Sequence, residues 1–182
     1  MSDKPTSITT VIELPPDGIA LAEARMAIDT LRGKRFVNRA TRIVAQLSSS
    51  AKGKLVSNKA TGKSKANGFT REQHNAMAAA IGNLFEAAAL RVSRPDKEGD
   101  ANILSIKRFA TEVRFGKRQA IAWITVKESK QHGHHIYSVE AIKLETLDRI
   151  VEVVSGNTPH ASSVPLRKMI AKAGDAVKGD AS

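Results

Sequence analysis

Residues 118–128, RQAIAWITVKE, decide the fold, because apolar and β-branched side chains occupy both faces of this stretch. Such a pattern is typical of a central strand that is covered on both sides. Strand-like segments precede it at 103–115 and follow it at 134–144. The glycines in Gly116-Lys117 and in 131–133 mark tight connections between the three segments. The sequence therefore predicts an antiparallel three-stranded meander.

The clearest helix signal lies upstream, at 70–90. Thr70 and Gln73 have the spacing of a capping box, which marks the start of a helix. Apolar residues then recur at helical spacing, at Met77, Ile81, Leu84, Phe85 and Ala88. We expect one long helix that buries this stripe against one face of the meander.

The remaining segments are shorter. Helical spacing over 17–32 ends at Gly33, and the two short apolar runs that follow are typical of small β elements. A stretch rich in Ser, Gly and Lys, 48–69, predicts a mobile basic loop. We expect an α+β fold: one domain over 17–155, between a flexible arm, 1–16, and a flexible C-terminal tail, 156–182.

Positive charge is concentrated in 33–71, which holds ten Lys or Arg and no Asp or Glu, in a chain of net charge +11. A field of one sign attracts polyanions and releases their counterions, so nucleic acid is the first partner to consider. A solvated flexible loop is the alternative interpretation. The candidate nucleic-acid-binding residues are Lys34, Arg35, Arg39, Arg42, Lys52, Lys54, Lys59, Lys63, Lys65 and Arg71.

Several classes of site are disfavoured. The chain has no cysteine, so disulfides, thiolate metal sites and Cys nucleophiles are excluded. Aromatic residues make up only 4%, which argues against a face of stacked rings for single strands. Gly62-Lys63-Ser64 lacks the earlier glycine and the following helix of a nucleotide-binding loop. We found no signal peptide or apolar span, and expect a cytoplasmic protein, bacterial or phage-delivered, with no membrane partner.

The histidines suggest proton transfer rather than metal binding. His134 and His135 begin a strand and point to opposite faces, and no Asp, Glu or Cys lies within their cluster, so we expect no metal site and no cofactor. His74 lies in the first turn of the expected helix, either as a surface residue or at a phosphate site. Arg108 and Lys127 lie where the strands change phase or end, and are either solvated charges or site residues.

Short motifs in the meander resemble domains of the large polyvalent proteins of phages and conjugative elements. They are Arg108-Phe109, Thr125-Val-Lys-Glu128 and Tyr137-Ser-Val-Glu140 with Ala141-Ile142. The likeness extends upstream over Gly33-Lys34, Asn38, Thr41, Ser48–Ser50 and Lys54 to cover about 31–144. Arg42 stands where the pattern has glycine, and Ala110-Thr111 replaces a more aromatic stretch. Such domains resemble in part the barnase–EndoU–colicin–RelE-like nucleases, which cut RNA without metal, although several relatives have no demonstrated activity.

Two functions follow as hypotheses. The first is a metal-independent endoribonuclease in which the RNA 2′-hydroxyl attacks the neighbouring phosphate. His135 or His74 would transfer protons, and Arg108 and Lys127 would stabilise the transition-state charge. Lys54 would hold the scissile phosphate, and Thr125 and Tyr137 would orient. The second is a non-catalytic nucleic-acid-binding or accessory module. RNA is the favoured partner over DNA, with a protein inhibitor or a larger phage protein as further candidates. A ribosome- or chromosome-associated structural protein fits the charge but not the meander.

Overall fold

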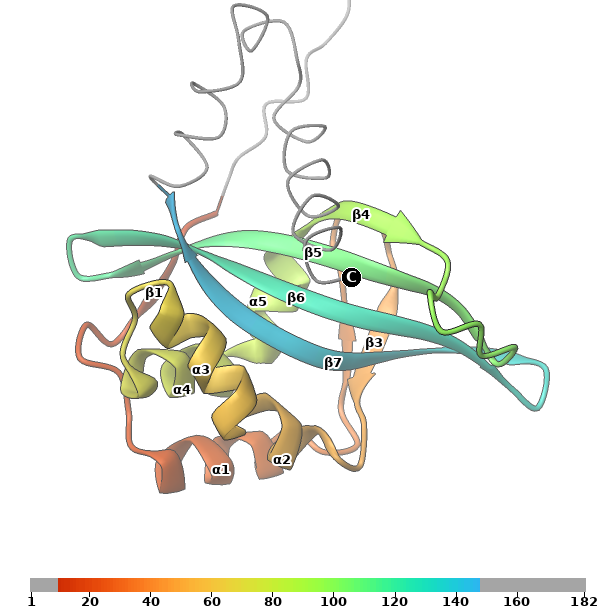
Figure 1. Ribbon diagram of the computed structural model, residues 1–182, viewed down its shortest axis with the longest axis horizontal. Helices are drawn as coiled ribbons and strands as arrows, with labels where there is room; N and C mark the ends of the chain where they lie inside the picture. Colours follow the sequence, from red (N-terminus) through yellow and green to blue (C-terminus); the bar gives the residue numbers. More distant parts are fainter. Residues whose placement is uncertain (1–9, 148–182) are drawn as a thin grey trace, which may run out of the picture.

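A computed structural model of the chain describes residues 10–147 (Figure 1). In these residues seven strands form one sheet in the order β1-β5-β6-β7-β3-β2, with β4 paired to β5. The strands are β1 (Ile12–Leu14), β2 (Arg35–Val37), β3 (Val44–Leu47), β4 (Ala89–Arg94), β5 (Ile103–Phe115), β6 (Arg118–Gln131) and β7 (His134–Thr146). The helices are α1 (Leu21–Thr30), α2 (Ala51–Leu55), α3 (Asn58–Ala66), α4 (Arg71–Ala79) and α5 (Ile81–Ala87).

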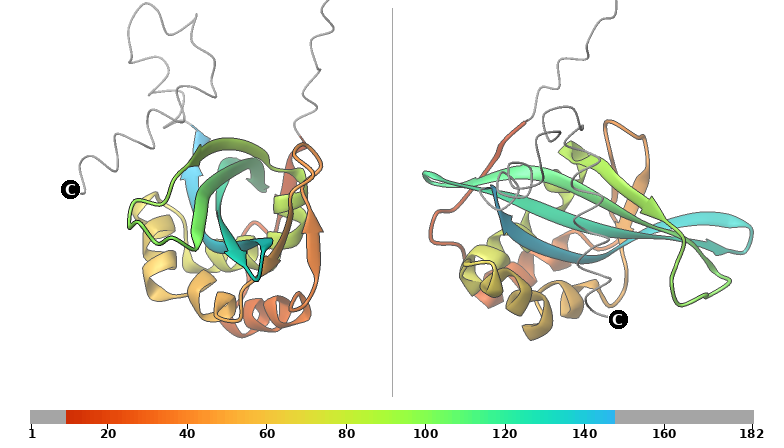
Figure 2. Two further views of the ribbon diagram at one scale, coloured as in Figure 1. Left: turned by 90° about the vertical axis from the view of Figure 1, so that its right-hand side faces the viewer. Right: turned by 45° about the horizontal axis from the view of Figure 1, so that its top comes forward.

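The sheet is mixed, and the expected three-stranded meander packed on one long helix is wrong. β5, β6 and β7 pair antiparallel through two-residue connections, Gly116-Lys117 and His132-Gly133. The flanking pairs are parallel: β1 lies along the end of β5, and β3 lies along the middle of β7. Figure 2 shows the resulting sheet strongly curled, with the helices gathered on one side. We call the face toward the helices the inner face and the opposite one the outer face.

The single helix expected over 70–90 is also wrong, because α4 ends at Ala79 and α5 starts at Ile81. Ala80 between them has φ −93° and ψ 11°, and its N–H is shared between the carbonyls of Ala76 and Met77. The break lets α5 approach β2 closely. A Cβ at Gly82 would lie 2.6 Å from Cε1 of Phe36, so only glycine fits there without a shift.

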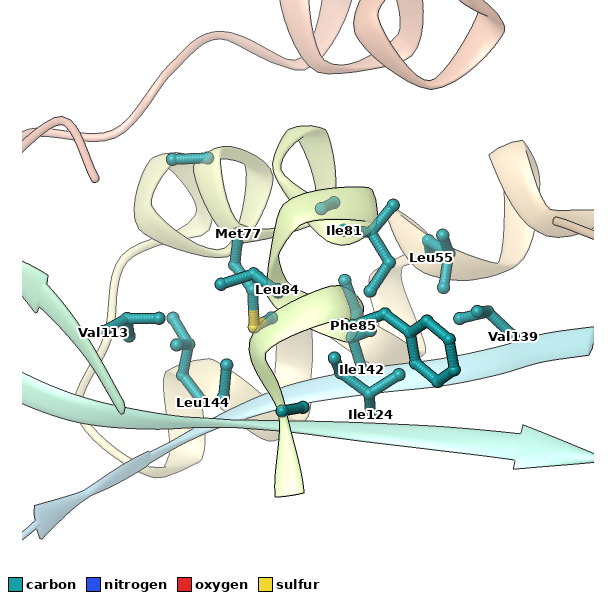
Figure 3. Close-up of a cluster of buried hydrophobic side chains, with 14 of the residues drawn as sticks. Leu55, Met77, Ile81, Leu84, Phe85, Val113, Ile124, Val139, Ile142 and Leu144 are labelled. Atoms are coloured by element: carbon teal, nitrogen blue, oxygen red, sulfur yellow. The ribbon is translucent and has the colours of Figure 1, made fainter. Parts of the chain in front are cut away.

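The core joins α4 and α5 to the inner face of the sheet (Figure 3). The five residues of the expected stripe are all buried. Phe85 on α5 meets Phe109 on β5 edge to face, with ring centroids 5.0 Å apart. Along β6, the residues at 120, 122, 124 and 126 are fully buried, which identifies the inner face of that strand.

The segment 48–69 is not a loop, because α2 and α3 occupy most of it. Ser57 caps α3 by accepting a hydrogen bond from the N–H of Ala60. α3 lies along the part of β7 that β3 leaves open. There Ser64 Oγ accepts from the N–H of Leu144, while Asn67 Nδ2 donates to the carbonyl of that residue. Helices that are poor by composition are thus held by contacts with the sheet.

The N-terminal boundary needs the same correction. Residues Ile12–Leu14, placed by the sequence in a flexible arm, form β1 against β5. The end of the expected domain, 148–155, and the expected tail, 156–182, lie outside the described residues.

A buried asparagine fastens β2 to the end of α5. Asn38 Nδ2 donates to the carbonyls of Phe85 and Ala88, both at 2.7 Å, which are carbonyls that a helix end leaves unpaired. Its Oδ1 accepts from the N–H and hydroxyl of Thr41. Arg42 follows with φ 64°, which explains the glycine expected at this place in the family pattern.

Candidate nucleic-acid interface

His74 is buried in the structure and is not available to a substrate, so neither of its expected places is correct. Its Nε2 donates to the carbonyl of Leu55 at 2.7 Å, and its Nδ1 therefore accepts from the hydroxyl of Ser64, also at 2.7 Å. Ser64 in turn accepts from the N–H of Leu144. We call Leu144, Ser64, His74 and Leu55 the His74 relay. Burial lowers the pKa of His74, although the hydrogen bond to Leu55 opposes this.

The other three catalytic candidates lie on two faces of the sheet. Arg108 pairs with Thr125, and Lys127 lies two residues further along β6, so both belong to the outer face. His135 pairs with Lys130 and turns its ring toward Glu128, on the inner face. The structure therefore brings Arg108 close to Thr125, but it brings neither His74 nor His135 to that pair.

A group of positive charges gathers where α3 meets the outer face. The pKa of Lys63 is lowered by partial burial and by the positive charges of Lys59, Lys143 and Arg108. Lys63 adjoins Ser64, which is bonded to the edge of β7, and this contact carries the lysine to the outer side of the sheet. Lys143 also forms an ion pair with Glu145 at 2.9 Å. We call Lys59, Lys63, Lys143 and Arg108 the four-cation cluster.

The ten predicted nucleic-acid-binding residues are divided between separate elements. Lys34, Arg35, Arg39 and Arg42 lie in or beside β2 and its connection to β3, whereas the other six lie on α2, α3 and α4. Lys52 pairs with Asp29, and Lys54 pairs with Glu140 at 2.8 Å. Within residues 10–147 the other eight form no ion pair, and Arg71 donates to Asn58. Lys54 is thus held by a carboxylate rather than kept for a scissile phosphate.

Sequence reasoning missed a second polar group, on the inner face beyond the helices. Glu128 Oε1 accepts from Tyr137 Oη and His135 Nδ1, both at 3.0 Å. Its Oε2 accepts from Ser105 Oγ at 2.5 Å and lies 3.7 Å from Lys107 Nζ. We call these five residues the Glu128 network; it lies near the β6–β7 turn, at the end of the sheet that extends past the helices (Figure 1).

The electrostatics of this network keep its carboxylate charged. Burial alone would raise the pKa of Glu128, but hydrogen bonds from Ser105, His135 and Tyr137 and the charge of Lys107 lower it overall. Burial and the neighbouring carboxylate raise the pKa of Tyr137, which keeps its hydroxyl protonated as a donor. The signal that could have found the network is the two-residue turn His132-Gly133, because it fixes Glu128 opposite Tyr137.

Two further properties bear on the class of site. Within the described part of the chain, no helix combines the length and the apolar character needed to cross a bilayer. The same residues contain no grouping of three or more His, Cys, Asp or Glu suited to a metal ion.

Comparison with known proteins gives one match. Neither a curated protein nor a solved structure is similar to the chain. A family model, large polyvalent protein-associated domain 3, matches residues 20–137, which include every described helix and most of the sheet. The chain belongs to the large polyvalent protein-associated domain 3 family.

Proposed function

We propose that this protein binds the phosphate backbone of nucleic acid, and that the four-cation cluster is the centre of the binding surface. The observation that carries the proposal is the lowered pKa of Lys63, caused by partial burial and by three neighbouring positive charges. Like charges held this close repel one another in the free protein. A phosphate would relieve the repulsion, and the counterions that it releases would favour binding further.

Other basic residues can extend this surface. Lys59 and Lys65 lie on α3 on either side of Lys63, and Lys127 lies on the outer face of the sheet, like Arg108. Lys54 and Lys143 each have a carboxylate partner, so they would contribute less than Lys59 and Lys63. With so few aromatic residues in the chain, contacts to phosphate rather than base stacking would supply most of the affinity.

The separation of the predicted catalytic residues favours binding over a nuclease built on the outer face. General acid–base catalysis needs its groups within hydrogen-bond reach of one reacting centre. His74 is enclosed in the core, and His135 lies on the face opposite Arg108 and Lys127. From the family we further infer that the protein works in phages or other mobile elements, with larger polyvalent proteins as its setting.

The test is the salt dependence of binding to labelled RNA and DNA, measured by fluorescence anisotropy. In the double variant Lys59→Ala/Lys63→Ala we expect about tenfold weaker binding at low salt, and a log–log salt slope smaller by about 2. The control Lys97→Ala/Lys117→Ala removes the same charge from two exposed positions elsewhere and should change affinity less. Equal losses in both double variants, or an affinity independent of salt, would contradict the proposal.

A further inference from the structure

The Glu128 network holds one histidine in a single orientation. An ionised carboxylate only accepts hydrogen bonds, so the Nδ1 atom of His135, 3.0 Å from Glu128 Oε1, carries the hydrogen. In the neutral ring, Nε2 then has a free lone pair. The side chain of His135 is 55% exposed, whereas that of Glu128 is only 12% exposed. The carboxylate is thus shielded while the far side of the imidazole faces solvent.

The rest of the network fixes the carboxylate rather than the histidine. Tyr137 and Ser105 each donate to one of its oxygens, from β7 and from β5. Lys107 lies beside Oε2 and also donates to Ser93 on β4 at 2.8 Å. Four neighbouring strands therefore contribute to holding one carboxylate, which in turn holds one exposed ring.

We propose that this network is a catalytic site for RNA, in which Glu128 positions His135 and His135 Nε2 acts as general base on a ribose 2′-hydroxyl. The base takes the hydroxyl proton, the 2′-oxygen forms a bond to the adjacent phosphorus, and the P–O5′ bond breaks. The 5′-oxygen keeps that electron pair and takes a proton from water, and the hydroxide so formed takes the proton back from His135. The products are a 2′,3′-cyclic phosphate and a 5′-hydroxyl, and no metal is consumed in the balance.

The charges around the ring suit this substrate class. Lys130 is exposed and lies directly opposite His135 in the β6–β7 ladder, where its ammonium can offset charge on the phosphate oxygens. Lys107 balances Glu128, so the carboxylate does not repel the phosphate strongly. RNA supplies its own nucleophile in the 2′-hydroxyl, so one positioned base is enough to begin the reaction.

A purely structural role explains less. Pairing Glu128 with Lys107 in a half-buried place brings little stability compared with apolar packing. Tyr137, Ser105 and Lys107 already satisfy both carboxylate oxygens, so the network would be complete without a histidine. The exposed His135 is the member that structure alone does not require.

The decisive experiment uses the full chain with a 5′-labelled single-stranded RNA in EDTA. We expect cleavage that leaves a cyclic phosphate, and none when the ribose at the cut is replaced by deoxyribose. His135→Gln should lower the rate at least about 100-fold without weakening RNA binding. His134→Gln is the matched control: this neighbour is equally exposed but points to the other face, and its loss should leave the rate unchanged.

The role of Glu128 needs a readout that folding alone would not change. Nitrogen-15 NMR shifts of His135 should report Nδ1–H with unprotonated Nε2 in the native protein, and a mixture of tautomers in Glu128→Gln. Glu128→Asp should restore part of the lost cleavage rate.

The outcomes separate this proposal from the binding function, on which its supply of RNA rests. RNA that is bound but left intact in EDTA would overturn the catalytic site and leave the binding function standing. Cleavage that survives in His135→Gln, or falls equally in His134→Gln, would overturn it as well. Cleavage with the four-cation cluster disabled would show that the site acts without that surface.

Discussion

The two ends of the sheet each contain a histidine held by hydrogen bonds, yet their surroundings differ. At the end covered by helices, His74 is fully buried and both ring nitrogens are bonded within the protein. At the end beyond the helices, His135 has one nitrogen bonded to Glu128, and its side chain is 55% exposed. The same side chain therefore links secondary-structure elements in one region and presents a lone pair in the other. The helical cover, rather than the residue type, makes the difference.

The largest expected contrast is in stability. His74→Ala leaves a cavity and three unpaired groups in the core, and should lower the free energy of unfolding by about 3–4 kcal/mol. His135→Ala removes an exposed ring whose bond water can replace, and should change it by less than about 0.5 kcal/mol. Urea denaturation of both variants measures the difference. Similar losses would show that the two networks are equally structural.

A matched pair of serines sharpens the comparison. Ser64→Ala takes a donor from His74 and an acceptor from Leu144, both buried, and should cost about 2 kcal/mol. Ser105→Ala removes one of several donors to Glu128, near solvent, and should cost about 0.5–1 kcal/mol. Thermal unfolding followed by circular dichroism suffices, and the reverse order of losses would contradict the distinction between the two ends.

Acid should act on the two ends in different pH windows. The pKa of His74 is lowered from 6.5, so below pH 6.5 the unfolded chain takes up a proton that the folded chain refuses. Stability should then fall by up to about 1.4 kcal/mol per pH unit. The pKa of Glu128 is lowered from 4.5, so its contribution is present above pH 4.5 and is lost as the pH falls through its lower folded value.

Denaturation curves measured at intervals from pH 7 to pH 4 test this order. His74→Gln should remove the slope between pH 6.5 and 4.5, and Glu128→Gln should leave that slope in place. A native protein whose stability is flat over this window would show that the relay tolerates a proton.

Local patterns in the sequence predict the burial of side chains better than the path of the chain. Met77 and Phe85 are buried at the spacing expected of a helix, but the break at Ala80 follows from Gly82 approaching Phe36, forty-six positions away in sequence. The Ser- and Lys-rich stretch predicts no helix, because α3 depends on contacts between its buried side and β7. Parallel pairing of β1 and β3 leaves no short-range signal at all.

The candidate site shows the same limit. His74 precedes Met77 by three residues and Ile81 by seven, which is the spacing of the buried stripe, so its burial was readable from the sequence. The Glu128 network required the register of one hairpin. His132 has φ 50° and Gly133 φ 80°, as in a type I′ turn, and histidine is an unusual residue for that conformation. The convergence of α3 with Arg108 depends on tertiary packing and has no counterpart in sequence spacing.

The two parallel pairings also constrain how the chain is made. Ile12 needs Val113 as its neighbour, and Ala45 needs Tyr137, so strands that leave the ribosome first wait for partners that leave it last. At about 5–20 residues per second, the intervening hundred or so residues take about 5–20 seconds to synthesise. During that interval the apolar edges of β1 and β3 have no native neighbour, which makes the nascent chain a natural client for chaperones.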